Sequence, residues 1–169
     1  MRGPAAMLSR MRARCAIESR YAHDMALRNL EAVVDELLTL PFPRQEIRKG
    51  DRSSGPGFHV HVLQASQDFW DGRDEETVEA AEGEIDAAFQ VLRAALTERW
   101  DMPETVDPGP YLSSGGPAPE PFNQLCQLSS TMLLWRRPQA DRWVALLVGQ
   151  ADPEFPIQLL AAVSDTAIP

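Results

Sequence analysis

The sequence has few cysteines and almost no lysine, and it contains no long apolar run. None of its 169 residues lies in a stretch of about eighteen apolar residues, the length that a transmembrane helix needs. The N-terminus also lacks the apolar region of a secretory signal peptide. Cys15 and Cys126 lie far apart, which favours a reduced protein over a disulfide framework. We therefore expect a cytoplasmic protein that does not bind a membrane.

Cations are also scarce relative to acids. Lys49 is the single lysine, and 16 lysines and arginines together face 25 acidic residues, for a formal net charge of -9. Binding to a nucleic-acid backbone needs clustered lysine and arginine, so this balance argues against general nucleic-acid binding. An acidic protein stays soluble and favours basic partners.

Motifs for covalent catalysis and phosphate binding are missing. There is no Gly-x-Ser-x-Gly nucleophile elbow, and the glycines of residues 114–117 are followed by no predicted helix, as a phosphate loop would require. Cys126 lies in an apolar run, which is typical of a buried, unreactive thiol. We therefore expect no catalytic residues and no cofactor.

The most informative feature that is present is an acidic run between residues 68 and 86. It carries nine acidic side chains against one arginine, Arg73. Like charges three or four residues apart on a helix repel each other by about 0.2–0.5 kcal/mol per pair. The helix dipole offsets this repulsion only in the first turn. The later acids are therefore better explained by a basic partner, and the candidate binding residues are Glu75, Glu79, Glu82 and Asp86.

Residues 1–18 differ in composition from the rest of the chain. Arginines outnumber acids there, Leu8 and Ile17 are the only branched aliphatic or aromatic residues, and no strong periodic stripe is present. Such a segment can bury little surface, which predicts a flexible basic N-terminal arm. The remaining residues, 19–169, are sufficient for a single globular domain with a sizeable core.

Apolar periodicity predicts two amphipathic helices. Apolar residues recur every three or four positions over residues 19–40, and again from an N-cap at Asp71 or Asp74 as far as Trp100. Pro41 should end the first helix. In the second helix, Phe89 lies midway along the apolar stripe, and we expect its ring in the core.

Two sequence patterns predict strands: alternation of apolar and polar residues, and short apolar runs. Residues 58–63 alternate, and residues 125–136, 142–149 and 157–163 form apolar runs separated by turn formers. Residues 111–112 predict an edge strand, and the polar residues 44–57 predict a loop. The expected fold class is α+β with two layers. Two helices pack on one face of a mostly antiparallel sheet of four to five strands, in the order α-β-α-β-β-β.

A histidine pair is a second candidate site. His59 and His61 are two residues apart in a predicted strand, so both project from one face and could share a metal ion. Asp68 or Asp71 lies near enough in sequence to complete a ligand set. The simpler interpretation is that both histidines occupy the less apolar face of the strand.

A hairpin rich in tryptophan and arginine is the third candidate. Tryptophan and arginine are enriched at binding hot spots. The alternative is that the indoles pack inside the sheet while the arginines solvate the turn. The residues of this secondary surface are Trp135, Arg136, Arg137 and Arg142, with Trp143 beside them.

The sequence therefore predicts a non-enzymatic, acidic protein-interaction domain that binds a basic protein partner. Immunity proteins, antitoxins and secretion chaperones are comparable in size and charge only. Two alternatives stay open. One is a small metal-dependent enzyme centred on His59 and His61, and the other is a homodimeric structural protein joined through a sheet edge or the long helix.

Overall fold

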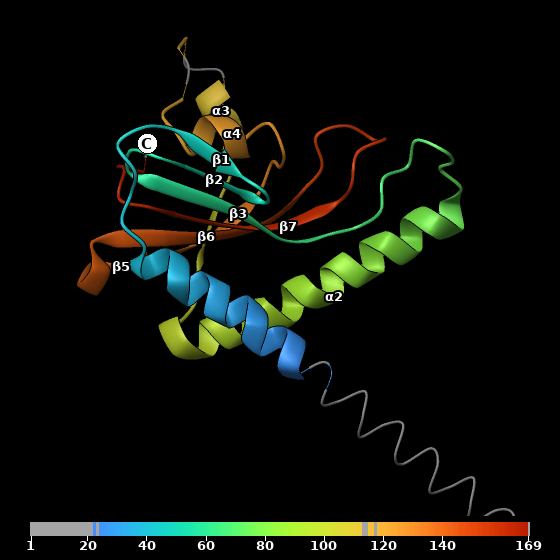
Figure 1. Cartoon of the computed structure of the whole chain (residues 1–169), viewed down its shortest axis with the longest axis horizontal. Coiled ribbons are helices and arrows are strands. Elements are labelled where there is room, and N and C mark those ends of the chain that lie inside the picture. The colour runs from blue at the N-terminus through green and yellow to red at the C-terminus, as the bar shows by residue number, and fades with distance from the viewer. Residues whose placement is uncertain (1–21, 23, 113–114, 117, 169) are drawn as a thin grey trace, which may run out of the picture.

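The described part of the chain is built around one seven-stranded antiparallel sheet (Figure 1). The computed structural model describes residues 22, 24–112, 115–116 and 118–168, so the basic segment 1–18 lies outside the described residues. Across the sheet, the strand order is β1-β2-β3-β7-β6-β5-β4. The strands are β1 (Ile47–Lys49), β2 (Arg52–Gly55), β3 (Phe58–Ala65), β4 (Glu104–Val106), β5 (Met132–Arg137), β6 (Arg142–Gly149) and β7 (Gln158–Ser164).

Two long helices pack on one face of this sheet (Figure 1). The first spans residues 24–39 and ends just before Pro41. The second, α2 (Glu75–Trp100), has Asp74 as its N-cap, whose Oδ1 accepts a hydrogen bond from the Thr77 backbone N–H at 2.9 Å. This bond and a second one from the Thr77 hydroxyl lower the pKa of the Asp74 carboxyl. Both predicted helices are confirmed.

Both faces of the central strands are buried, which explains why β6 is apolar from Trp143 to Val148. Val144 and Leu146 point toward the helices and pack in the same cluster as Leu92 of α2. Ala145 and Leu147 point the other way and pack in a second cluster with Phe122, from the short helix α4 (Phe122–Leu125). The α+β class is therefore confirmed, and β6 is covered on both sides.

The sheet has more strands than the sequence predicted. Residues 44–57, expected to form a loop, contain the β1–β2 hairpin. This hairpin lies at the edge of the sheet and β1 is fully exposed, so it needs no apolar residues. At the opposite edge lies β4, whereas residues 111–112, expected to form an edge strand, belong to the short helix α3 (Gly109–Leu112).

The strand predicted over residues 125–136 begins later than expected. Leu125 ends α4, and the chain then turns, so that β5 starts only at Met132. Leu125 and Met132 are both buried. A short apolar run is buried equally well as a helix or as a strand, so the sequence pattern did not separate the two. The strand predicted at residues 157–163 is confirmed as β7.

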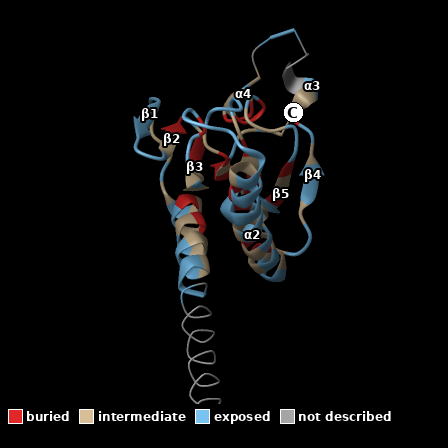
Figure 2. Cartoon of the chain, turned by 90° about the vertical axis from the view of Figure 1, so that its right-hand side faces the viewer, coloured by how far each residue is buried: buried red, intermediate tan, exposed pale blue. Residues whose placement is uncertain are grey.

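The first half of α2 projects away from the sheet, with two loops beside it (Figure 1). The Ser66 N–H donates to the Ile157 carbonyl at 2.8 Å, and the Phe69 N–H donates to the Glu154 carbonyl at 2.9 Å. These bonds join the two loops to each other. We call this projection, residues 66–86 and 150–157, the acidic projection. Much of the α2 surface is exposed in Figure 2.

Candidate protein-interaction site

The four acidic candidates form one exposed stripe along α2. Glu75, Glu79, Glu82 and Asp86 are separated by four, three and four residues, which places them on one side of the helix. All four are exposed. Among the described residues, none of these carboxylates takes part in an ion pair. Asp86 accepts one hydrogen bond, from the Gln90 side chain at 3.2 Å. We call these four residues the acidic stripe.

The acidic stripe runs into an open groove between α2 and one end of the sheet. The groove has a volume of about 770 Å³. Glu82, Asp86, Phe89 and Arg93 line it from α2. Facing them are the ends of β5 and β6, the segment before β5, and Ile157; the apolar lining residues include Leu133, Leu146 and Val148. Carboxylates thus lie beside an apolar surface in the same groove.

Phe89 lies on α2 at the boundary between the hydrophobic core and the groove. We expected its ring in the core, but it is only partly buried, whereas Ile85 and Leu92 on the same helix are 1% and 0% exposed. Phe89 packs at the margin of the core and also lines the groove. Its exposed part therefore supplies apolar surface that a partner could cover.

The wall opposite α2 is held in place by close backbone contacts. Gly149, at the end of β6, touches Leu128 so closely that an added Cβ would lie 2.9 Å from the Leu128 carbonyl oxygen. The Gln150 N–H donates to that same oxygen at 3.0 Å. Ser129 follows, and its hydroxyl donates to the Thr131 carbonyl at 2.9 Å. A pre-formed wall of this kind lowers the entropic cost of binding.

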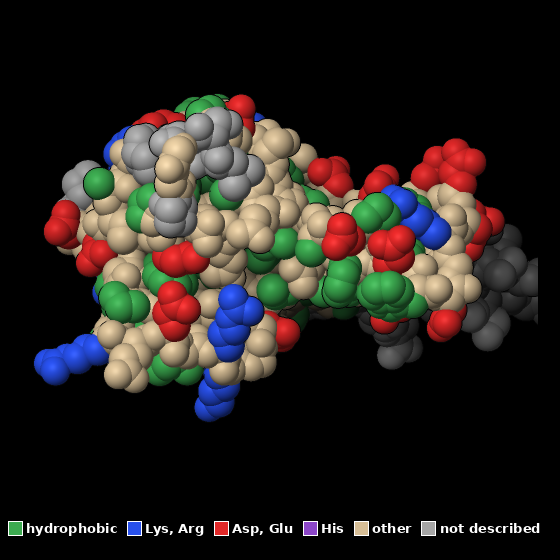
Figure 3. Space-filling model, turned by 90° about the horizontal axis from the view of Figure 1, so that it is seen from above, with side chains coloured by type: hydrophobic (Ala, Val, Ile, Leu, Met, Phe, Trp, Pro, Cys, Tyr) green, Lys and Arg blue, Asp and Glu red, His purple; other side chains and the backbone are tan. Residues whose placement is uncertain are grey.

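Charges are distributed unevenly along the groove. The carboxylates of Glu82 and Asp86 lie toward the start of α2, and Arg93 lies two turns further along the helix. Figure 3 shows acidic and hydrophobic side chains together where the body meets the narrower acidic projection. A segment bound there would place its positive charge toward the acidic projection.

An exposed aromatic pair at the acidic projection was missed by the sequence analysis. Trp70 is 61% exposed and Phe155 is 42% exposed. Their ring centroids lie 5.3 Å apart in an edge-to-face arrangement. Trp70 and Phe155 come from two loops, which are joined by the hydrogen bond from the Phe69 N–H to the Glu154 carbonyl. The one sequence signal was a tryptophan inside an acidic, polar segment, where no apolar stripe accounts for it.

The Trp–Arg hairpin is largely occupied by contacts within the chain. Trp135 and Trp143 are 2% and 4% exposed, and each indole N–H donates to a backbone carbonyl. Arg136 forms a two-pronged contact with Glu104, at 2.7 and 3.3 Å. The guanidinium of Arg137 lies over the Trp100 ring, with 4.8 Å from Cζ to the ring centroid.

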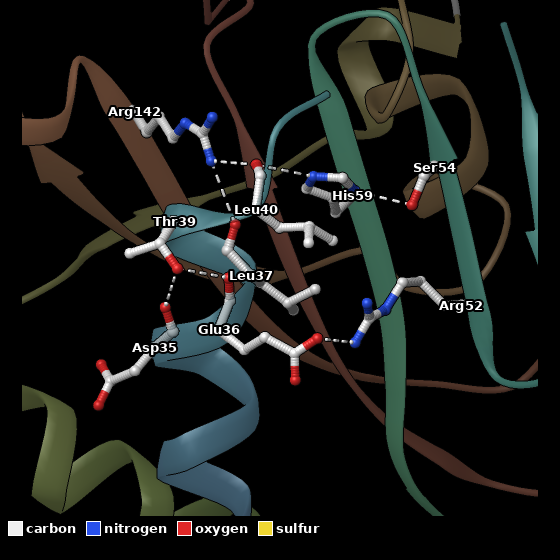
Figure 4. A network of polar contacts seen from close by, with 9 residues as sticks. All are labelled: Asp35, Glu36, Leu37, Thr39, Leu40, Arg52, Ser54, His59 and Arg142. Carbon is white, nitrogen blue, oxygen red and sulfur yellow. Dashed lines mark hydrogen bonds and ion pairs between the residues drawn. The ribbon is translucent and has the colours of Figure 1, made fainter. Parts of the chain in front are cut away.

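Arg142 stabilises the end of the first helix (Figure 4). Its Nη1 donates to the carbonyls of Leu37, Leu38 and Leu40 at 3.2, 2.8 and 2.9 Å. The last carbonyls of a helix have no partner within the helix, and a cation there also complements the helix dipole. The indoles and Arg142 therefore hold the fold together, and Arg136 and Arg137 remain as the outer part of this secondary surface.

The two histidines project from the same face of β3, but their surroundings differ. His59 is 1% exposed and uses both ring nitrogens. Its Nε2 donates to the Leu40 carbonyl at 3.2 Å, so Nδ1 is the acceptor for the Ser54 hydroxyl at 2.7 Å (Figure 4). Burial lowers the pKa of His59, and also that of His61.

His61 has one ring nitrogen that is free to bind a metal ion, as the candidate metal site at His59 and His61 would require. Its Nδ1 is buried and has no hydrogen-bond partner. A metal shared with His59, however, would have to displace Ser54 or Leu40 from that ring. Among the described residues, no group of three or more histidine, cysteine, aspartate or glutamate side chains is arranged to hold a metal ion.

Comparison with known protein families, with curated proteins and with solved structures finds no match for this chain. Within the part of the chain that the structure describes, no helix combines the length and the apolar character needed to cross a membrane. The features of this chain that bear on its function are the acidic stripe, the groove and the aromatic pair.

Proposed function

We propose that this chain is a non-enzymatic interaction domain that binds a basic, partly apolar segment of a protein partner. The observation that carries the proposal is the position of Glu82 and Asp86. Both belong to the acidic stripe and both line the apolar groove. One bound segment can therefore meet carboxylates and apolar side chains at once.

The helix dipole favours Glu75, which lies in the first turn, but beyond that turn the Asp86–Gln90 hydrogen bond is the one contact among the described residues that offsets the repulsion within the acidic stripe. The side chains repel each other, and no ion pair within the described residues relieves that repulsion. Arginine or lysine side chains of a partner would relieve it. Mutual repulsion in the free protein is thus converted into attraction in the complex, and the attraction also raises the rate of encounter.

The dimensions suit a short peptide segment. From Glu75 to Arg93, α2 covers about 27 Å, at about 1.5 Å per residue. An extended segment of about eight residues has the same length. Alternating basic and apolar side chains would then face the carboxylates and the floor of the groove in turn. The affinity of a complex with a short peptide segment ranges from transient to tight, and it depends mainly on how well a few buried anchor residues fit.

Selection from a random peptide display library tests the proposal without a known partner. The immobilised protein should enrich sequences in which arginine or lysine is combined with leucine, isoleucine or aromatic residues. Binding of an enriched peptide should weaken by at least about tenfold in Glu82→Lys/Asp86→Lys, since two attractive charges become repulsive.

The matched control is Glu76→Lys/Glu84→Lys. It makes the same change in net charge on the same helix, but neither position lines the groove. Equal loss of binding in the two double variants would show that net charge alone attracts the peptide, and enrichment of acidic or uncharged sequences would contradict the proposal outright.

A further inference from the structure

The aromatic pair of Trp70 and Phe155 is an exposed apolar feature that is separate from the acidic stripe. It lies on the acidic projection, which carries nine acids between residues 68 and 86, and Asp152 and Glu154 beside Phe155. Arg73 is the single cation in these two segments. Exposed aromatic rings surrounded by carboxylates form an environment of negative potential with polarisable faces, which suits a cation.

Two other aromatic rings, those of Trp100 and Phe42, are already covered by arginines. Arg99 and Arg137 lie over the Trp100 ring, at 5.1 and 4.8 Å, and Arg142 lies over Phe42 at 4.0 Å. Among the described residues, the cation–π contacts involve those two rings, and neither Trp70 nor Phe155 has one. Arg73 is three residues from Trp70 in sequence but does not cover it.

The geometry of the pair leaves a corner for a planar cation. The ring planes meet at 75°, with the centroids 5.3 Å apart. A planar group that stacks on one ring can therefore place its own edge against the face of the other. Guanidinium is flat, weakly hydrated and stacks well on aromatic faces, whereas an ammonium group is compact and strongly hydrated.

We infer that the bound segment carries an arginine whose guanidinium docks on Trp70 and Phe155, and that Trp70 is the principal anchor for it. This inference rests on the proposed function and adds the residue type and its point of contact. Phe155 is two residues from Ile157, which lines the groove. The aromatic corner and the groove are therefore linked by a short stretch of chain, and one segment can reach both.

Nuclear magnetic resonance with defined peptides tests the inference. The probes are two octapeptides, one alternating arginine and leucine and the other alternating lysine and leucine. Trp70→Phe identifies the Trp70 indole N–H signal. Among the four indoles, we expect the Trp70 signal to shift most when the arginine peptide is added, because Trp70 is exposed whereas Trp135 and Trp143 are buried. The Trp70 signal should shift less with the lysine peptide, because an ammonium group stacks less well on an aromatic ring.

Affinity measurements provide a second readout on folded variants. Trp70→Ala should weaken binding of the arginine peptide by about fivefold to thirtyfold, and that of the lysine peptide by less. Met102→Ala is the matched control, because Met102 is 74% exposed but lies beyond the far end of α2. It should leave both affinities unchanged.

The outcomes separate this inference from the proposed function. If Glu82→Lys/Asp86→Lys abolishes binding while Trp70→Ala and the Trp70 indole signal show no effect, the groove stands and the arginine anchor is wrong. If Trp70→Ala weakens binding and the double variant does not, the anchor stands and the groove is wrong. If neither variant weakens binding of the arginine peptide, both fail.

Discussion

The two halves of α2 (Glu75–Trp100) differ in what surrounds their charged side chains. In the second half, Leu92 and Leu96 are fully buried against the sheet, and Arg99 bridges to Glu31 and Asp35 of the first helix at 3.3 and 2.7 Å. In the first half, the acidic stripe projects into solvent without ion pairs among the described residues. Arg99 is thus paired where the helix packs, whereas the carboxylates of the acidic stripe are unpaired among the described residues where the helix projects. We therefore expect the acidic charge to be dispensable for the fold, and we propose that it serves to bind a partner.

The buried half of α2 should be the most sensitive to truncation. Leu92→Ala removes a side chain with no exposed surface and should lower the free energy of unfolding by about 2–5 kcal/mol. Phe89→Ala, at the margin of the groove, should cost less than a fully buried ring would. Chemical denaturation of both variants would measure the difference. A larger loss for Phe89→Ala than for Leu92→Ala would mean that the groove is closed in solution.

The contact between Arg142 and the first helix should have the next largest effect. Arg142→Leu removes this donor from the carbonyls of Leu37, Leu38 and Leu40. The Leu40 carbonyl keeps its bond from His59, and a carbonyl that is left buried and unpaired costs about 1–3 kcal/mol. The control is Arg136→Leu, which breaks an exposed pair with Glu104 that is worth about 0–1 kcal/mol. Thermal melting curves that show equal losses would contradict the structural role of Arg142.

The buried histidine predicts a dependence of stability on pH. Burial holds the folded-state pKa of His59 below its ordinary value of 6.5, so the unfolded chain binds a proton more readily. His59 therefore contributes full stability above about pH 6.5. That contribution should be lost as the pH falls from there toward the folded-state pKa, with a slope of at most about 1.4 kcal/mol per pH unit for one group.

Substitution of His59 should make this pH dependence shallower. His59→Gln keeps an amide donor and acceptor but does not titrate in this range. His61 also has a lowered pKa and should account for part of the remaining slope. Unfolding free energies measured from pH 7.5 to pH 5 would test this. An unchanged slope in His59→Gln/His61→Gln would show that other groups dominate.

Charge reversal on the exposed half should have the smallest effect on stability. The variant Glu79→Lys/Glu82→Lys/Asp86→Lys replaces exposed side chains and removes mutual repulsion, so its melting temperature should stay within about 2 °C of the parent protein. Differential scanning calorimetry measures this directly. A fall of several degrees would indicate that the acidic stripe stabilises α2.

The sequence predicted the long elements better than the edges of the sheet. The apolar stripe that includes Ile85, Leu92 and Leu96 identified α2, because a helix packed on one side shows its period plainly. The hairpin of β1 and β2 was missed because neither strand shows apolar alternation: β1 is an exposed edge strand, and β2 (Arg52–Gly55) contains no apolar side chain. β4 has three residues, which is too short for any periodic signal.

The candidate site was predictable only in part. The acids of the stripe could be found because their spacing along a helix is visible in the sequence. The groove was not predictable, because its opposite wall comes from residues 128–133 and 146–150, and only the folded sheet brings these to α2. The pairing of Trp70 with Phe155 likewise depends on a contact between two loops.

The comparison between the two halves of α2 is tested most directly by binding of one enriched basic peptide to two charge-matched variants. Fluorescence anisotropy would compare Glu82→Lys/Asp86→Lys with Glu76→Lys/Glu84→Lys at the same ionic strength. We predict at least about tenfold weaker binding in the first and a much smaller change in the second, with both proteins folded. Equal affinities in the two variants would contradict the assignment of the acidic stripe and groove as the binding site.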